Sequence, residues 1–565
     1  MAKSQAKRYA IGVDYGTNSV RAVIFDVADG SEVGSHVHHY PSGEEGILCD
    51  PRDPNLARQN PADYIEGFYK SVGGAMRAAE GQPDFKAASI VGLGVDTTGS
   101  TPLPVDRQGM PLALDRAFRD DLAAQAWLWK DHTSHAEAAE LTEKASKGRL
   151  PYLAKCGGRY SSEWFWSKIL RCRRTAPRVF KAAYSWIELS DFVPAFITGN
   201  LDPHIAPRNI CAAGHKAMYN PAWGGLPSKK YLASVDPALA EIRERYAEAR
   251  AANEVAGGLA AEVAEKVGLP SGLPVAVGLL DAHAGAVGSG IKPGTLVKII
   301  GTSTCDMMVV PMKEKLADVP GVAGIVPSSI VPGMYGIEAG QSAVGDIFNW
   351  FARQLAPARY GGNGDAHTGL SGEAEHLRPG ESGLVALDWN NGNRNILMDP
   401  LVTGLVVGQT LHTTAGEIYR ALIEATAFGA LTIIQRIEEY GVEVKEVVNC
   451  GGIAEKSPLV MQIYADVCNR PMKISRAPQT CALGAAIFGA VVGGAYKSVE
   501  QAQRKMAGTK PTIYRPRKPA AATYAELYRL YRTLHDAFGT RTFKGSVYEV
   551  MKELIRVRDR VRGEQ

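Results

Sequence analysis

The stretch Tyr9–Asp26, YAIGVDYGTNSVRAVIFD, decides the fold of this 565-residue chain. Two apolar runs flank a short polar turn, a pattern that predicts a strand, a tight turn and a second strand. Gly16 lets the backbone turn sharply and approach a ligand closely. Three polar side chains that suit a phosphate follow the glycine: Thr17, Asn18 and Ser19. Asp14 ends the first strand, where it is placed to hold a cation or the water around it. An ordinary hairpin turn explains the same residues, so this stretch alone leaves phosphate binding open.

The same pattern recurs far along the chain. Thr295–Val310, TLVKIIGTSTCDMMVV, again has an apolar run, a turn at Gly301, Thr302 and Ser303, and a second apolar run, but it lacks the acid. Two such units in one sequence indicate a duplicated domain. We therefore expect two phosphate-facing hairpins that grip one polyphosphate from opposite sides of a cleft.

Two other predicted strands end in an aspartate. An apolar run over residues 275–280 leads into Asp281, which is followed by small residues that leave room for a substrate. This makes Asp281 the strongest candidate for a general base, with a helix N-cap as the alternative. A second run, over residues 89–95, leads into Asp96. Ligands of α/β sheets are met at such strand ends, although a capping aspartate in a loop is nearly as good an interpretation.

A glycine pair and a lysine complete the set of candidates. Gly451 and Gly452 follow a predicted strand and would allow the flat approach of an aromatic ring such as adenine. A plain tight connection between strand and helix is the alternative. Lys216 lies in RNICAAGHKAMY among residues that do not call for a charge, which makes it a candidate ligand contact. A lone lysine is more often an ordinary surface group.

Two segments are expected to be exposed helices. Leu239–Val267 is rich in Ala, Glu and Arg and predicts a helical hairpin that is broken at Gly257 and Gly258. The tail from Ala520 onward is charged and predicted to be helical and peripheral.

Composition places the chain among enzyme-sized α/β proteins. It is 45% hydrophobic and too long for one core, so two large domains are expected. The net charge of +4 gives no basic field for nucleic acid. Eight cysteines without a CxxC pair suggest neither a zinc cage nor a disulfide framework and fit a cytoplasmic location. No signal peptide and no membrane-spanning run are expected.

Other nucleotide-binding motifs fit poorly. A P-loop needs a Gly-Lys pair, and the chain has no such dipeptide. A dinucleotide fingerprint would start at Gly92 and Gly94 but has Thr97 at its third glycine position. What remains favours ATP-dependent phosphoryl transfer on a duplicated, actin-like fold.

Four stretches, DYGTNSVR, IGTSTCDMMV, DAHAGAVG and NCGGIAEKSPL, resemble the FGGY family of carbohydrate kinases. AGHKAM and IEAGQSAVGD are similar to the L-ribulose kinases within that family. The resemblance implies an α/β fold with two actin-like (ribonuclease H-like) domains and a deep interdomain cleft. It implies an N-terminal domain over 1–288, a C-terminal domain over 289–510 and a helical tail over 511–565.

The resemblance also assigns roles. Asp281 matches the base that takes a proton from the sugar hydroxyl, and Asp14 matches the acid that, with Asp281, holds Mg²⁺. The expected substrate-binding residues are Gly99, Lys216, Asp281 and Glu338. The expected ATP-binding residues are Gly16, Thr17, Asn18, Ser19 and Arg21 on the first turn, Gly301, Thr302 and Ser303 on the second, and Gly451 and Gly452 at adenosine.

The implied activity is conversion of L-ribulose to L-ribulose 5-phosphate, with a small-molecule sugar as partner and a homodimer as one assembly open to the chain. Gly99 stands where related enzymes can carry Ala, which predicts a slightly roomier pocket. Two alternatives stay open at this point. One is a kinase for another pentulose or pentitol, such as D-ribulose, ribitol or xylulose, and the other is an actin-like, nucleotide-gated chaperone.

Overall fold

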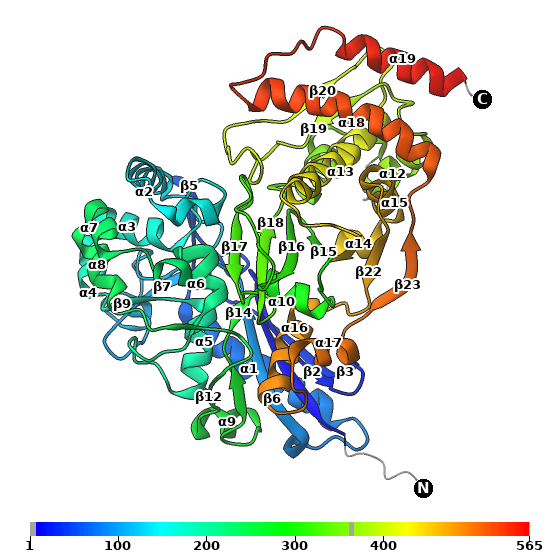
Figure 1. The fold of residues 1–565 in the computed structure, drawn as a ribbon. Helices are drawn as coiled ribbons and strands as arrows, with labels where there is room; N and C mark the ends of the chain where they lie inside the picture. Colours follow the sequence, from blue (N-terminus) through cyan, green and yellow to red (C-terminus); the bar gives the residue numbers. More distant parts are fainter. Residues whose placement is uncertain (1–6, 361–365, 564–565) are drawn as a thin grey trace.

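The computed structural model describes residues 7–360 and 366–563 and divides into two halves, each built on a mixed sheet (Figure 1). The strand order is β12-β13-β6-β1-β2-β3 in the first sheet and β23-β22-β21-β15-β16-β18-β17 in the second. The first six strands of the second sheet pair in the same directions as the six of the first. The duplication predicted from the two hairpins is therefore confirmed at the level of topology.

The strands of the first sheet are β1 (Tyr9–Tyr15), β2 (Ser19–Asp26), β3 (Glu32–His39), β6 (Ile90–Thr97), β12 (Val255–Gly258) and β13 (Pro274–Ala276), with β14 (Leu279–Leu280) paired to β6. Those of the second are β15 (Thr295–Ile300), β16 (Thr304–Pro311), β17 (Gly324–Pro327), β18 (Met334–Ala339), β21 (Glu446–Cys450), β22 (Met472–Ser475) and β23 (Thr509–Tyr514). The main helices around the second sheet are α11 (Gly345–Trp350), α12 (Ala366–His376), α13 (Ala415–Glu439), α14 (Gly452–Lys456) and α15 (Pro458–Cys468).

One helix late in the chain covers the first sheet. α16 (Thr480–Val492) lies against β1 and β6, while α1 (Pro61–Glu80) lies against β2 and β3 (Figure 1). The approach is so close that a Cβ on Gly12 would lie 1.8 Å from the Ala482 carbonyl oxygen. A Cβ on Gly94 would lie 1.9 Å from that of Ala485. Glycine is therefore required in these strands because the helix backbone occupies the side-chain space.

A second helix pairs with α16 between the sheets. α10 (Asp281–Gly288) begins directly at the candidate base and packs along α16. A Cβ on Gly484 would lie 1.9 Å from the Ala284 carbonyl oxygen, so small residues set this contact too. Val287 of α10 shares a core with Val297 and Met307 of the second sheet. The two helices thus join the halves through one buried layer.

Residues 98–250, together with strands β4 (Leu48–Asp50) and β5 (Asp53–Gln59), add a lobe to the first half, most of it seen in cyan and green in Figure 1. Its core is aromatic and includes Trp127, Trp164, Trp166 and Trp186, all buried. Its helices are α2 (His135–Lys147), α3 (Phe165–Thr175), α4 (Pro177–Ala182), α5 (Leu189–Thr198), α6 (Ile210–Ala217), α7 (Lys229–Val235) and α8 (Pro237–Arg243). Its other short strands are β7 (Pro102–Val105), β8 (Ala126–Trp127), β9 (Ser185–Glu188), β10 (Arg208–Asn209) and β11 (Ala249–Arg250).

The helical hairpin expected over 239–267 is wrong. α8 ends at Arg243, and Gly257 and Gly258 lie in strand β12, which pairs with β13, before α9 (Ala261–Val267) begins. Pairing at the sheet edge overrides the local helix propensity of the Ala- and Glu-rich sequence.

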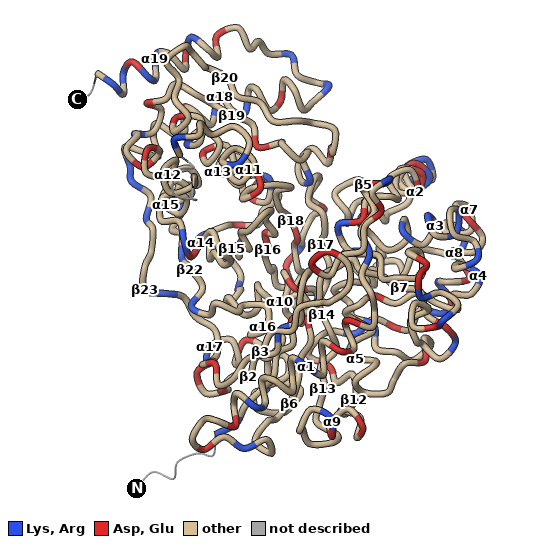
Figure 2. The backbone as a smooth tube through the Cα atoms, turned by 180° about the vertical axis from the view of Figure 1, so that it is seen from behind, with Lys and Arg blue, Asp and Glu red and all other residues tan. Residues whose placement is uncertain are grey.

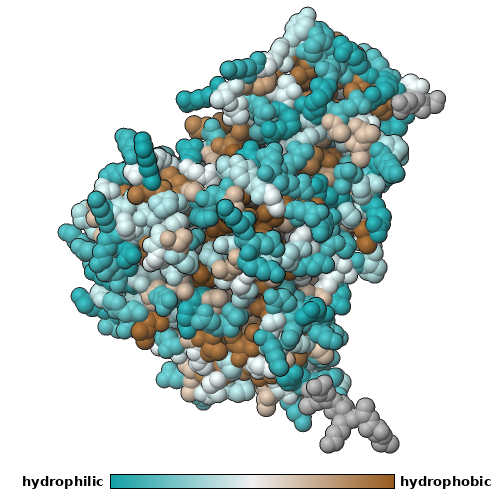
Figure 3. Space-filling view, viewed as in Figure 1, coloured by the Kyte–Doolittle hydropathy of each residue, from teal (hydrophilic) through white to brown (hydrophobic). Residues whose placement is uncertain are grey.

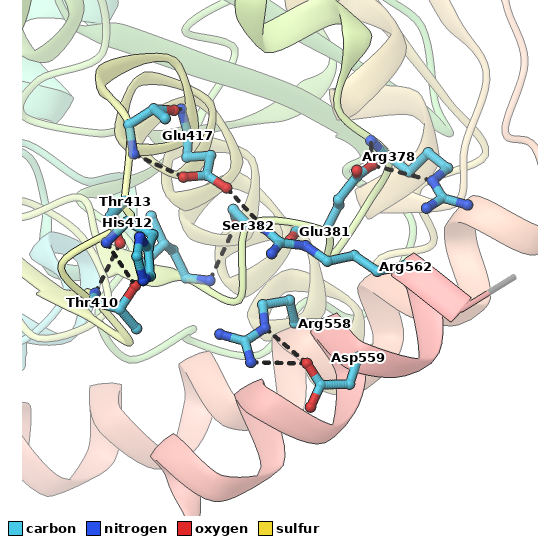
Figure 4. Close-up of polar contacts among 12 residues, drawn as sticks. Arg378, Glu381, Ser382, Thr410, His412, Thr413, Glu417, Arg558, Asp559 and Arg562 are labelled. Carbon is cyan, nitrogen blue, oxygen red and sulfur yellow. Dashed lines mark hydrogen bonds and ion pairs between the residues drawn. The ribbon is translucent and has the colours of Figure 1, made fainter. Parts of the chain in front are cut away.

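The prediction that the tail from Ala520 onward is peripheral is also wrong. α18 (Lys518–Gly539) buries Tyr524, Leu527 and Tyr531 in the core of the second half, beside β19 (Val385–Leu387) and β20 (Leu405–Val407). α19 (Val550–Gly563) then docks on α13, where Arg562 Nη2 donates to Glu417 Oε1 at 3.1 Å (Figure 4). The apolar stripe of α18 decides its place, and its charged residues cover only the outer face.

Charged residues of both signs alternate along the backbone, with no long stretch of one sign (Figure 2). The face shown in Figure 3 is largely hydrophilic, with small scattered hydrophobic areas. Across the described ranges, none of the helices has the length and apolar character that crossing a membrane requires.

Candidate active site

The first polar turn is anchored by its neighbours. The Gly16 N–H donates to the Ser19 carbonyl at 3.0 Å and closes the turn between β1 and β2. Trp129 Nε1 donates to Thr17 Oγ1 at 3.1 Å, and Asn18 Nδ2 donates to the Glu45 carbonyl at 3.0 Å. These bonds fix the turn on the lobe and on the loop after β3. Arg21 lies opposite Asp14 in the β1–β2 ladder.

Three aspartates gather at the same edge of the first sheet. Asp14 and Asp96 are partners in the parallel β1–β6 ladder, and β14 pairs with β6 up to Leu280, directly before Asp281. Parallel strands end at a common edge, which is why acids 267 residues apart in sequence (281 minus 14) meet. The structure therefore brings Asp14 and Asp281 to one edge, together with Asp96, the other strand-end aspartate of the sequence.

Burial shapes the acidity of these carboxyls. Burial and the nearby Asp14 raise the pKa of Asp281 to about 7. Burial raises the pKa of Asp14, which Arg21 opposes, and burial with the charge of Asp14 raises that of Asp96 well above its usual value. The Asp96 oxygens are buried and accept no hydrogen bond from a donor in the described residues. Such oxygen donors, buried and close together, fit a hard divalent cation.

A lysine–glutamate pair lies beside Asp281. Lys216 on α6 donates through Nζ to Glu338 on β18, at 2.8 Å to Oε1 and 3.0 Å to Oε2. Asn209 caps α6 by accepting from the Ala212 N–H. Lys216 is 5% exposed, so the surface-group interpretation is wrong. The two residues come from different halves of the molecule, and their charges act on Asp281.

The charge of Glu338 is well compensated. Burial opposes its ionisation, but the Lys216 ammonium, with His215 and His283 in their protonated forms, outweighs burial and holds its pKa well below the usual value. Burial lowers the pKa of His283 to about 4 and that of His215 well below its ordinary value. The pocket therefore offers one ammonium, one carboxylate and two neutral imidazoles at neutral pH.

The second turn and the glycine pair lie together on the second sheet. Ile299 pairs with Cys450 in the parallel β15–β21 ladder, so Gly301 and Gly451 follow neighbouring strand ends. The Val344 N–H donates to the Thr302 carbonyl at 2.7 Å and the Gly345 N–H to the Gly301 carbonyl at 3.0 Å, which ties the turn to α11. Gly451 has φ +97°, and a Cβ there would lie 2.6 Å from the Ile300 carbonyl oxygen. Thr302, Gly451 and Gly452 are all exposed.

The prediction that Gly99 makes the sugar pocket roomier is wrong. A Cβ on Gly99 would lie 2.2 Å from Leu280 Cδ2, so the Leu280 side chain already fills the space of the missing methyl group. The glycine makes room for a neighbouring residue and does not enlarge the site.

Several residues at the site were not predicted. His283 is two residues after Asp281, and His215 directly precedes Lys216. Arg394 of the second half lies 3.8 Å from Glu163 of the lobe, as measured between Nη2 and Oε1. For the histidines the signal was adjacency to predicted residues, whereas nothing local in the sequence joins Arg394 to Glu163.

Comparison with known proteins gives a consistent result. Residues 9–288 match the model of the N-terminal domain of the FGGY family of carbohydrate kinases, and residues 296–493 match that of its C-terminal domain. A ribulokinase of Shouchella clausii is 41% identical, with 99% of each chain covered. A ribulokinase of Mycolicibacterium smegmatis is 39% identical, with 95% of each chain covered.

Solved structures agree with the fold. A xylulose kinase from Rhodospirillum rubrum superposes with a TM-score of 0.77 at 25% identity, covering 94% of this chain and all of that one. Plasmodium falciparum glycerol kinase with ADP superposes with a TM-score of 0.75 at 14% identity, covering 93% and 98%. With both halves of the sequence matched and the actin-like topology repeated in each, the chain belongs to the FGGY family of carbohydrate kinases and is an ATP-dependent sugar kinase that uses a divalent metal.

Proposed function

We propose that this kinase transfers the γ-phosphoryl group of ATP to the 5-hydroxyl of L-ribulose, with Mg²⁺ as the metal. The full-length similarity to proteins named ribulokinase supports this substrate. One structural observation carries the mechanism. Asp281 lies at the sheet edge that carries the three aspartates, and the charges of Lys216 and Glu338 act on it. Burial and Asp14 raise its pKa to about 7. A general base works best when its pKa lies near the working pH.

In this mechanism Asp281 accepts the proton of the 5-hydroxyl as its oxygen attacks the γ-phosphorus and the bond to the β,γ-bridging oxygen breaks. Lys216 donates to sugar hydroxyls and Glu338 accepts from them, which orients the chain of the sugar. The backbone near Gly99 closes the pocket.

The nucleotide would lie between the two turns. Gly16–Ser19 with Arg21, and Gly301–Ser303, would hold the phosphates, and the exposed Gly451 and Gly452 would face adenine. Asp14 and Asp281 would hold Mg²⁺, since their oxygen donors fit a hard cation. Bound Mg²⁺ offsets negative charge on the transferring group.

The test is Asp281→Asn, which keeps the shape of the side chain and removes its basicity. We expect kcat to fall by about 10²–10⁴-fold with little change in sugar binding. Asp202→Asn is the matched control, because Asp202 is exposed and its side chain accepts from the His204 N–H through an oxygen that Asn keeps. An Asp281→Asn enzyme with wild-type kcat would remove Asp281 from the mechanism.

The sugar itself is tested by a panel of L-ribulose, D-ribulose, xylulose and ribitol in a coupled ADP assay. The highest kcat/KM is expected for L-ribulose, and a higher value for another sugar would replace it as substrate.

The chaperone alternative has no support, because the family is one of carbohydrate kinases. The domain limits at 288 and 510, a homodimer and a cytoplasmic location stay predictions, to be checked by limited proteolysis, light scattering and cell fractionation.

A further inference from the structure

Two buried histidines that the kinase mechanism does not use form a donor cluster with Glu338. His215 Nδ1 lies 3.2 Å from Glu338 Oε2, and His283 Nε2 lies 3.6 Å from the same oxygen. One donor atom of each residue lies within 4.8 Å of the others, and the two rings are 4.5 Å apart between centroids. Both histidines are 1% exposed.

The contacts around His215 distinguish its two ring nitrogens. Nε2 lies 3.0 Å from the Ser329 hydroxyl, which also lies 3.1 Å from the Val326 carbonyl oxygen. Nδ1 lies 3.2 Å from Glu338 Oε2 and makes no hydrogen bond within the described residues. In the tautomer whose proton is on Nε2, the lone pair of Nδ1 is available to a cation that Glu338 also binds.

The other nitrogens of the cluster are also without partners. His283 Nδ1 and Nε2 and His215 Nδ1 are buried and make no hydrogen bond within the described residues. Gly324 on β17 makes room for the His215 ring, because a Cβ there would come within 2.1 Å of Nδ1. Buried nitrogens are rarely left in this state without a ligand or water.

We propose that His215, His283 and Glu338 form a site for a divalent transition metal, for which Zn²⁺ is the natural probe. Two imidazoles and one carboxylate are a common zinc donor set that leaves one position open. Donor atoms around tetrahedral zinc lie about 3.3–3.5 Å apart, given bonds of about 2.0–2.1 Å. The observed 3.2 and 3.6 Å separations already match this spacing. Ser329 holds the distal nitrogen of His215, as outer partners of zinc-bound histidines do.

Lys216 is the cation that contacts Glu338 directly, and the charge of Arg394 also acts on that carboxylate. Its ammonium bonds both oxygens of Glu338, so the metal would take Oε2 while Lys216 keeps Oε1. The charges of Asp281 and Glu338 act on each other, and the neighbouring acids at the strand edge offset part of the added positive charge. Because Glu338 and Lys216 are the proposed sugar contacts, metal binding would exclude the sugar, and this last step rests on the proposed function.

Direct binding tests the site without ATP or sugar. The full-length protein, freed of metal, is titrated with Zn²⁺ against a chromophoric chelator. We expect a Zn²⁺ site that is lost in His215→Gln and in His283→Gln but kept in His204→Gln, the control at an exposed histidine bonded to Tyr184. Any Zn²⁺ held at Asp14 and Asp281 is common to all of these proteins. Ser329→Ala keeps all three ligands and should weaken Zn²⁺ binding by about 10–100-fold.

Two results would overturn the site. One is a wild-type protein that takes up no Zn²⁺, a measurement that needs no variant. The other is equal Zn²⁺ uptake by wild type, His215→Gln and His283→Gln, each checked for folding by its melting temperature.

The titration is then repeated with L-ribulose, which we expect to weaken Zn²⁺ binding to the wild type. If Zn²⁺ binds through the three residues but the sugar has no effect, the metal site stands and the proposed roles of Lys216 and Glu338 in sugar binding fall. The two proposals can therefore fail separately.

Discussion

At the scale of single residues, Asp281 sets the pH dependence of the reaction. Burial and Asp14 raise its pKa to about 7, and only the ionised form accepts a proton. We expect kcat/KM for the sugar to rise with pH and to level off above about pH 7. Rates measured from pH 5 to 9 at saturating ATP check this. An inflection near the ordinary aspartate value of about 4 would contradict it.

The same raised pKa has a cost in stability. Ionisation of Asp281 disfavours the folded state, so its destabilising effect is absent below about pH 4 and complete above about pH 7. Asp281→Asn removes that charge. We expect the variant to melt higher than wild type at pH 8, by roughly 2 °C or more, with a smaller difference at pH 5. Equal differences in melting temperature at pH 5 and pH 8 would mean that ionisation of Asp281 does not destabilise the folded state.

Lys216 is expected to act on the sugar and not on the nucleotide. Lys216→Met leaves Glu338 buried without its ammonium partner, which is costly for a carboxylate. The KM for the sugar should rise at least about tenfold, a loss of roughly 1.4 kcal/mol, with the KM for ATP unchanged. Lys473→Met is the control, since it breaks a comparable pair with Glu446 at 2.6 Å in the second sheet. A rise in the KM for ATP alone would show that Lys216 binds the nucleotide and not the sugar.

Local sequence located these residues but not their partners. Asp14, Asp96 and Asp281 each follow an apolar run, which is a signal that one short stretch carries. The pairing of Lys216 with Glu338 joins positions 122 residues apart, and it arises because α6 packs on β17, the neighbour of β18. The filling of the space beside Gly99 by Leu280 is likewise a contact between distant segments.

At the scale of elements, α18 supports the second turn through a chain of buried hydrogen bonds. The Tyr531 hydroxyl donates to Asp388 Oδ1 at 3.0 Å, and Gln341 Nε2 donates to Asp388 Oδ2 at 2.7 Å. Lys298 Nζ then donates to Gln341 Oε1 at 3.2 Å and pairs with Asp306 at 2.7 Å. Lys298 and Asp306 lie on β15 and β16, on either side of the turn.

Tyr531→Phe should therefore disturb nucleotide binding. Loss of one buried hydrogen bond is worth about 1 kcal/mol, so we expect the KM for ATP to rise by about fivefold. Tyr528→Phe is the matched control. Tyr528 lies on α18 like Tyr531, but its hydroxyl bonds Gln435 and Thr432 of α13, which are not part of the hydrogen-bonded series that leads to the turn. Equal effects of the two changes on the KM for ATP would show that α18 acts only through general stability.

Element type was predictable where the apolar pattern was strong. The two hairpins formed as predicted, because both strands of each are mainly apolar. The segment 239–267 failed because its helix-forming residues pair at a sheet edge, and the tail failed because its apolar stripe at Tyr524, Leu527 and Tyr531 outweighs its charge.

At the scale of the whole molecule, the contact between α10 and α16 should make the halves unfold together. Gly484→Ala would place a methyl group 1.9 Å from the Ala284 carbonyl oxygen and force the helices apart. Such overpacking costs about 1–3 kcal/mol. We expect a lower melting temperature in one transition and reduced kcat. Gly372→Ala, on α12 with nothing within 4 Å, should be neutral or stabilising. Two separate transitions in the Gly484→Ala protein would show that the halves are independent.

The position of α16 also has a consequence for synthesis on the ribosome. The strands that contain Gly12 and Gly94 lie in the first hundred residues, whereas α16, the helix that packs on them, consists of residues 480–492. A nascent polypeptide that has emerged only as far as residue 288 must keep that apolar face open to water. We expect such a fragment, expressed alone, to be captured by chaperones or to aggregate, and to be rescued by co-expression of residues 289–565.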